Sequence, residues 1–84
     1  MRNVVLYTRE GCCLCETALE TLTRVQTRHP GSFRLEQRDI EADDAVFRAY
    51  LERIPVVTID GQESFELFVD EQALEQRLGI VQTR

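Results

Sequence analysis

Three cysteines lie close together near the start of the chain, at Cys12, Cys13 and Cys15, and the sequence has no others. Their clustering leaves no distant pair that could link separate parts of the fold through a disulfide. Disulfide exchange requires an exposed thiolate nucleophile and a second thiol close enough to resolve the mixed disulfide. Two intervening residues on the first turn of a helix would put Cys12 and Cys15 on one face. The spacing therefore favours a redox-active disulfide between these two residues.

We expect Cys12 to be the nucleophile and Cys15 to be the resolving thiol. Cys12 would lie at the start of a helix, where unpaired backbone N–H groups and the helix dipole favour negative charge. Glu10 and Glu16 oppose the formation of a thiolate and Arg9 supports it, and these surface charges are screened and partly cancel. Cys12 and Cys15 are therefore the predicted catalytic residues.

Two other interpretations of the cysteines remain open. A Cys-x-x-Cys pair is also half of a zinc site, and thiolates carry metals and iron–sulfur clusters. The only histidine, His29, follows Cys15 by 14 residues, or about 20 Å along a helix. We therefore predict no metal ligand set and expect His29 to be a solvated residue at the helix end. The cysteines could also be small buried residues, although three in four positions is a poor core pattern.

The first half of the chain is expected to form a strand, a helix and a second strand. Residues 4–7 are a short apolar run, which is typical of a buried strand. After the cysteines, apolar residues recur at spacings of three and four until His29-Pro30-Gly31, as in an amphipathic helix. Residues 33–38 alternate between apolar and charged, which predicts a strand at the sheet edge, parallel to the first. The residues expected to face inward from the helix are Leu14, Ala18, Leu19, Leu22 and Val25.

The second half is expected to form a helix, a hairpin and a final helix. A helix over residues 42–52 must end before Pro55. The turn pair Asp60-Gly61 predicts a hairpin between strands at 56–59 and 64–69. Asp70 is suited to cap the last helix, and Gly79 to end it. The apolar stripe of the second helix consists of Val46, Phe47, Tyr50 and Leu51.

The resulting order, β-α-β-α-β-β-α, predicts an α/β fold with a four-stranded mixed sheet flanked by helices, in a single domain of residues 1–84. A strand followed by Cys-x-x-Cys at a helix start, and Ile-Pro before a hairpin, resembles the glutaredoxin branch of the thioredoxin fold over residues 3–79. The segments Tyr7 to Cys15 and Arg53 to Val56 most resemble small bacterial glutaredoxin-like proteins. The resemblance implies a thioredoxin-like fold and a thiol–disulfide oxidoreductase. A non-catalytic interaction module that keeps only the fold is the remaining alternative.

The resemblance also implies a substrate-binding surface. In this fold the proline that matches Pro55 is typically cis and faces the active-site cysteines, which would leave the Ile54 backbone free to pair with an extended substrate. Arg9 matches a basic position that favours an anionic end of a substrate. Many glutaredoxins also carry a Gly-Gly pair that helps to hold glutathione, where this chain has Leu67 and Phe68. Glutathione is therefore expected to be a poorer co-substrate here.

The composition limits the partners of the protein. A net charge of −5 and a pI near 4.8 would repel nucleic acid and anionic membrane surfaces. No apolar run approaches the length of a membrane span, and we expect a cytoplasmic location. We also expect a monomer with no bound cofactor. The expected partners are a protein or small molecule with a disulfide and, as reductant, glutathione or a thioredoxin-reductase-type enzyme.

Overall fold

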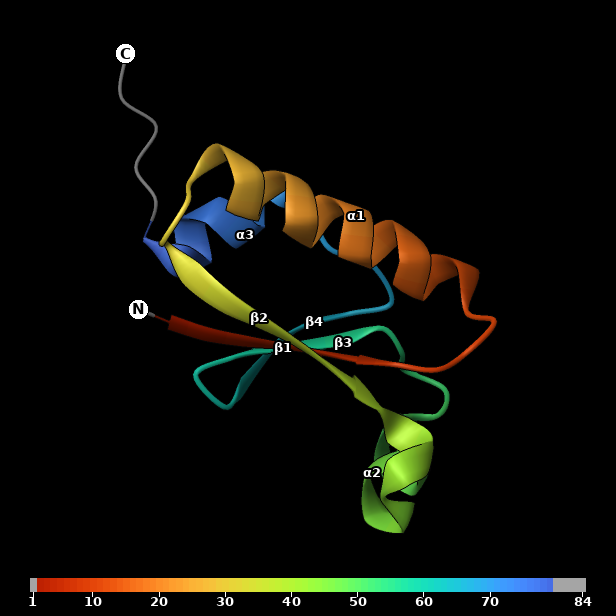
Figure 1. Cartoon of the computed structure of the whole chain (residues 1–84). Coiled ribbons are helices and arrows are strands. Elements are labelled where there is room, and N and C mark those ends of the chain that lie inside the picture. The colour runs from red at the N-terminus through yellow and green to blue at the C-terminus, as the bar shows by residue number, and fades with distance from the viewer. Residues whose placement is uncertain (1, 80–84) are drawn as a thin grey trace.

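The computed structural model describes residues 2–79, which contain one mixed sheet of four strands in the order β2-β1-β3-β4 (Figure 1). The predicted order of elements and the mixed sheet are confirmed. The strands are β1 (Arg2–Thr8), β2 (Phe33–Asp39), β3 (Val56–Ile59) and β4 (Gln62–Glu66). The helices are α1 (Cys13–Arg28), the short 3₁₀ helix η1 (Ile40–Ala42), α2 (Asp44–Tyr50) and α3 (Glu71–Leu78).

The central strand β1 pairs with β2 in parallel and with β3 in antiparallel orientation. β2 lies at the edge of the sheet, as its alternating pattern predicts. The β3–β4 hairpin turns at Asp60 and Gly61, whose φ angles are 53° and 83°. Positive φ at both central residues is what a tight two-residue hairpin requires, and Asp-Gly suits it.

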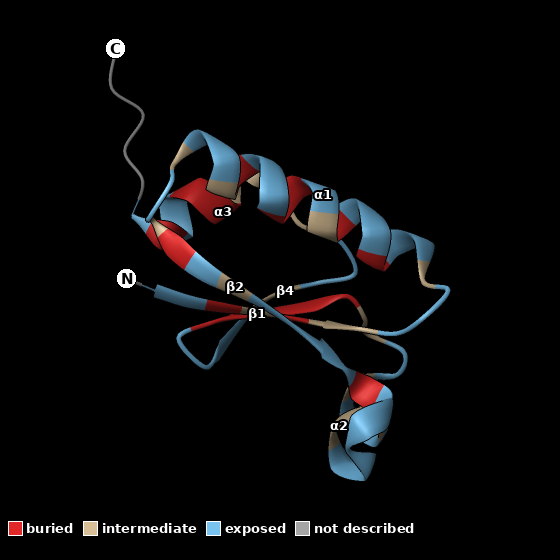
Figure 2. Ribbon diagram, in the orientation of Figure 1, coloured by how far each residue is buried: buried red, intermediate tan, exposed pale blue. Residues whose placement is uncertain are grey.

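The core lies between the sheet and the pair formed by α1 and α3, which cover the same face (Figure 1). Alternate residues of β1 and β3 point toward these helices, because side chains on a strand alternate between faces. The buried side of α1 faces the sheet in Figure 2. The fully or almost fully buried core residues include Val4, Leu6, Ala18, Leu22, Val25, Phe33, Val57, Ile59, Leu74 and Leu78.

Charged side chains join the surfaces of α1 and α3. Arg24 and Arg28 both bind Glu71, and the hydrogen bond from Arg24 lowers the pKa of Glu71. His29 Nε2 lies 3.4 Å from the carboxylate of Glu75, and the His29 side chain is 29% exposed. His29 therefore ends α1 as expected, but its side chain is only partly solvated, because Glu75 of α3 lies beside it.

The second helix differs most from its prediction. The Asp43 side chain accepts hydrogen bonds from the N–H groups of Ala45 and Val46, so α2 begins at Asp44 and not at Ala42. The helix ends at Tyr50, and none of its residues is fully buried. α2 lies beyond the end of β2 and leaves most of the sheet face uncovered (Figure 1). The residues of its apolar stripe belong neither to the core cluster nor to the partly buried residues packed against it.

Two smaller expectations are also wrong. Cys15, and not Leu14, takes the buried position on the first turn of α1, and Leu14 is 51% exposed. β4 ends at Glu66 and not at Val69, because Leu67 has a φ of 73°, outside the range of a strand. The chain leaves the sheet at this residue. Asp70 and Gly79 cap α3 as predicted.

Truncation of Leu22 and of Leu51 compares the core beneath α1 with the C-terminal end of α2. Leu22 is fully buried between α1 and the sheet, so Leu22→Ala should lower the free energy of unfolding by about 2–5 kcal/mol. Leu51 is 36% exposed, so Leu51→Ala should cost about 1 kcal/mol or less. Chemical denaturation followed by circular dichroism measures both. Equal losses would show that α2 contributes a second core.

Candidate redox site

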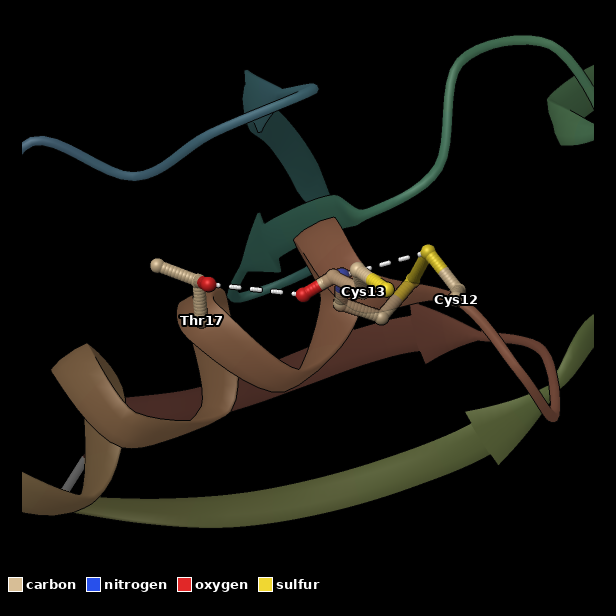
Figure 3. The surroundings of a disulfide bond; sticks show 4 residues. Cys12, Cys13 and Thr17 are labelled. Carbon is tan, nitrogen blue, oxygen red and sulfur yellow. Dashed lines mark hydrogen bonds between the residues drawn. A yellow bond between two sulfur atoms is a disulfide. The ribbon is translucent and has the colours of Figure 1, made fainter.

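Cys12 and Cys15 form a disulfide at the N-terminus of α1, with their Cα atoms 5.2 Å apart (Figure 3). Cys12 is the N-cap of the helix, and its Sγ accepts a hydrogen bond from the backbone N–H of Cys15 at 3.1 Å. A turn leads into the cap: Cys12 N–H donates to Arg9 O, and Gly11 has a φ of 83°. The sulfur of Cys12 therefore lies where the first N–H groups of a helix favour negative charge.

The two sulfur positions differ in access to solvent. Cys15 is 3% exposed and belongs to the buried stripe of α1, whereas Cys12 is half-buried at the start of the helix. Cys13 is the first residue of α1, is exposed, and carries the free thiol beside the disulfide. Cys12 and Cys13 are therefore more accessible to an incoming group than Cys15 is.

A surface pocket of about 300 Å³ adjoins the disulfide. Arg9 is part of its lining, but Arg9 Nε donates to the carboxylate of Glu41, and its guanidinium lies 5.5 Å from the centre of the Phe47 ring. Arg9 is thus beside the disulfide as predicted, with its charge already paired. Its role in binding a substrate stays a prediction. The pocket is lined by Leu6, Thr8, Arg9, Glu10, Gly11, Cys12, Cys15, Glu16, Leu19, Gln37 and Asp39.

Pro55 is buried and precedes β3, and the Ile54–Pro55 peptide bond is cis, as expected. Val56 pairs with Tyr7 in the sheet, so this segment reaches the same end of β1 from which the chain continues to the cysteines. The Ile54 N–H, however, donates to Tyr50 O at 3.0 Å. The expectation of a free Ile54 backbone is therefore wrong for its N–H, because the end of α2 uses it. The carbonyl oxygen is the group that a substrate strand could use.

Arg53 fixes this segment to β4, which the sequence analysis did not foresee. Its guanidinium binds Glu63 and lies 2.8 Å from the carboxylate of Glu66, and it also lies 5.2 Å from the centre of the Tyr50 ring. The hydrogen bond from Arg53 is the main cause that lowers the pKa of Glu63, and burial raises the pKa of Tyr50. The only sequence signal was a basic residue two positions before a proline, which by itself identifies no partner.

The segment after β4 presents apolar side chains to solvent. Leu67 is 42% exposed and Phe68 is 69% exposed, although both are large and hydrophobic. The Leu67 N–H donates to Pro55 O at 2.8 Å, so this segment lies beside the cis-proline. The sequence analysis assigned both residues to the second strand of the hairpin, whereas in the structure they follow the end of β4.

Among residues 2–79, no three side chains of the His, Cys, Asp and Glu types are grouped as a metal site requires. Within the same part of the chain, each helix is too short or too polar to cross a membrane.

The sheet order and the dithiol at the start of α1 define a thioredoxin-like fold. The chain belongs to the family described as glutaredoxin-like domain (DUF836), whose model matches residues 3–79. It is similar to the solution NMR structure of protein Ne2328 from Nitrosomonas europaea, with 31% identity and a TM-score of 0.77 over 90% of this chain and 89% of that one. The X-ray structure of protein XcR50 from X. campestris is 28% identical, with a TM-score of 0.72 over 94% of this chain and 99% of that one.

A mutant thioredoxin from Halobacterium salinarum shares the fold at 17% identity, with a TM-score of 0.65 over 92% of this chain and 71% of that one. Among curated proteins, none matches the chain significantly. The comparisons therefore establish the family and the fold.

The oxidised protein should react with a maleimide at Cys13 alone, because Cys12 and Cys15 are joined and Cys13 is exposed. Mass spectrometry of a tryptic or chymotryptic digest should find one label per chain at Cys13. After reduction, further labels should appear, with Cys12 modified before the buried Cys15. Labelling of Cys15 ahead of Cys12 would contradict the difference in exposure.

Proposed function

We propose that this protein is a thiol–disulfide oxidoreductase, which reduces disulfides of proteins or small molecules with Cys12 and Cys15. The observation that carries the proposal is the unequal placement of the two sulfurs. Cys12 is accessible and accepts an N–H bond at the start of α1, whereas Cys15 is buried directly behind it. Such a pair suits a nucleophile and a resolving thiol, because only the first must reach a foreign disulfide.

The exchange proceeds in two steps from the reduced protein. The Cys12 thiolate attacks one sulfur of the substrate, forms a mixed disulfide and releases the other sulfur as a thiolate. Cys15, deprotonated, then attacks Cys12 Sγ, closes the Cys12–Cys15 disulfide and releases the second substrate thiolate. Two electrons pass to the substrate, and the two protons of the dithiol end on its two thiols. The Cys15 N–H stabilises the Cys12 thiolate before the first step, and again when reduction of the Cys12–Cys15 disulfide regenerates that thiolate.

The oxidised protein then needs a thiol reductant, for which we propose glutathione or a thioredoxin-reductase-type enzyme. Leu67 and Phe68 bear on this choice, because large exposed side chains lie where many glutaredoxins have a Gly-Gly pair. They would hinder the close backbone approach that glutathione makes there. Each backbone hydrogen bond lost in this way removes about 0.5–1.5 kcal/mol of binding. Glutathione is accordingly the weaker of the two candidates.

Replacement of each cysteine by serine tests the assigned roles. Cys12→Ser should abolish exchange, and Cys15→Ser should accumulate a mixed disulfide at Cys12, because the resolving step is lost. Cys13→Ser is the matched control and should retain most of the activity, since Cys13 is outside the disulfide. NADPH consumption measures turnover, with either glutathione and its reductase or thioredoxin reductase. Intact-mass spectrometry detects the adduct.

The same experiment decides among the remaining functions. Loss of activity without a trapped adduct in either variant would contradict the assigned roles. Metal that copurifies with the wild type and is lost in the cysteine variants would favour a thiolate metal or iron–sulfur carrier. A reduced wild type that exchanges with no disulfide would favour a non-catalytic interaction module.

A further inference from the structure

The pocket beside the disulfide has an acidic lining. Glu10 and Glu16 flank the two cysteines in the sequence and line the pocket, and Asp39 joins them from the end of β2. All three carboxylates are exposed to solvent. The pocket beside the disulfide is thus lined by three acidic residues and by one basic residue, Arg9.

Two arginines near this end of the sheet, Arg9 and Arg53, are already paired. Arg9 donates to Glu41, and Arg53 holds Glu63 and Glu66. An anionic substrate would have to displace a carboxylate to reach either guanidinium. A cationic substrate would instead find Glu10 and Glu16, for which the structure shows no ion pair among residues 2–79.

We propose that the physiological disulfide partner carries positive charge next to its disulfide, as a protein cysteine flanked by lysine or arginine does. The inference rests on the proposed function and adds the substrate class of that site. It reverses the expectation, drawn from Arg9, of an anionic substrate end. The electron transfer is the two-step exchange described above, in which the cationic groups of the substrate do not react.

The size of the pocket suits one side chain or a small disulfide, because about 300 Å³ is at the lower limit of ligand sites. The negative charge of the pocket lining acts in two ways. It raises the local concentration of a cationic disulfide near Cys12, and it disfavours an anionic one. Exposed charge pairs are each worth little, so we expect the two carboxylates Glu10 and Glu16 together to change the selectivity by about threefold to tenfold.

Three small disulfides that differ in charge test the proposal on the full chain. The reduced protein, free of external thiols, is mixed with cystamine (a dication), bis(2-hydroxyethyl) disulfide (neutral) or 3,3′-dithiodipropionate (a dianion). The reaction is quenched with N-ethylmaleimide, and intact mass gives the rate of Cys12–Cys15 oxidation. Each rate is divided by that of the neutral thiol 3-mercapto-1-propanol with the same disulfide, which removes differences in intrinsic reactivity. The normalised rates should fall from the cationic to the anionic disulfide.

Salt and charge variants identify the cause. Raising the ionic strength from about 0.01 M to about 1 M shortens the screening length from about 30 Å to about 3 Å, so the preference should nearly vanish. Glu10→Gln/Glu16→Gln should lower the ratio of cationic to anionic rates by about threefold to tenfold. This ratio is independent of any change in the thiolate fraction of Cys12. Glu20→Gln/Asp44→Asn removes the same charge from exposed positions that do not line the pocket, and should leave the ratio nearly unchanged.

The outcomes separate the two proposals. Exchange with all three disulfides at equal normalised rates, or a preference for the anionic one, would overturn the charge preference and leave the oxidoreductase intact. An equal effect of the two double variants would also overturn it, because net charge and not the pocket would then be the cause. Failure to react even with the neutral disulfide would overturn the proposed function, and the charge preference with it.

Discussion

The position of the dithiol depends on the packing of α1 against the sheet. Four residues, 9–12, connect the end of β1 to the start of α1, so the helix can begin only at this end of the sheet. The stripe that contains Ala18, Leu22 and Val25 then fixes the rotation of the helix about its axis. Cys15 continues this stripe and is buried, whereas Cys12 precedes the first turn and stays accessible. One packing interaction thus sets the different environments of both sulfurs.

The two sides of the site have different chemistry. On one side, Glu10, Glu16 and Asp39 surround the pocket next to the disulfide. On the other, Leu67 and Phe68 present apolar surface beside Pro55. The cationic partner proposed above is complementary to the first of these surfaces, whereas the anionic glutathione molecule is not.

The short helix α2 lies outside the core but holds the segment before Pro55 in place. α2 buries none of its residues fully, yet its last carbonyl accepts the Ile54 N–H, and its Tyr50 ring contacts both Arg53 and Tyr7. The contacts of Arg53 with Glu63 and Glu66 connect the same segment to β4. The segment before the cis-proline is therefore held from two elements, although little apolar area is buried there.

The sequence by itself determined the elements with strong local signals. The buried positions Ala18, Leu22 and Val25 of α1, the Asp60-Gly61 turn, the Asp70 cap and the Gly79 end depend on near neighbours along the chain, and the structure has them as predicted. The Cys-x-x-Cys spacing likewise favoured a disulfide between Cys12 and Cys15, which the structure contains. These features could be predicted because hydrogen bonds and periodicity within a few residues decide them.

Only the tertiary structure decided which charges and apolar side chains meet. Glu41 pairs with Arg9 from 32 positions away, and Glu75 covers His29 from a different helix. Leu67 and Phe68 leave the sheet because Leu67, with its positive φ, ends β4. Leucine seldom adopts this conformation, so the sequence does not predict it. Pairing between distant segments depends on how the elements pack, so the local pattern of a sequence does not predict this pairing. The sequence pattern did not predict the acidic pocket beside the disulfide for the same reason, because Asp39 lines it from the end of β2 while Glu10 and Glu16 line it from near the cysteines.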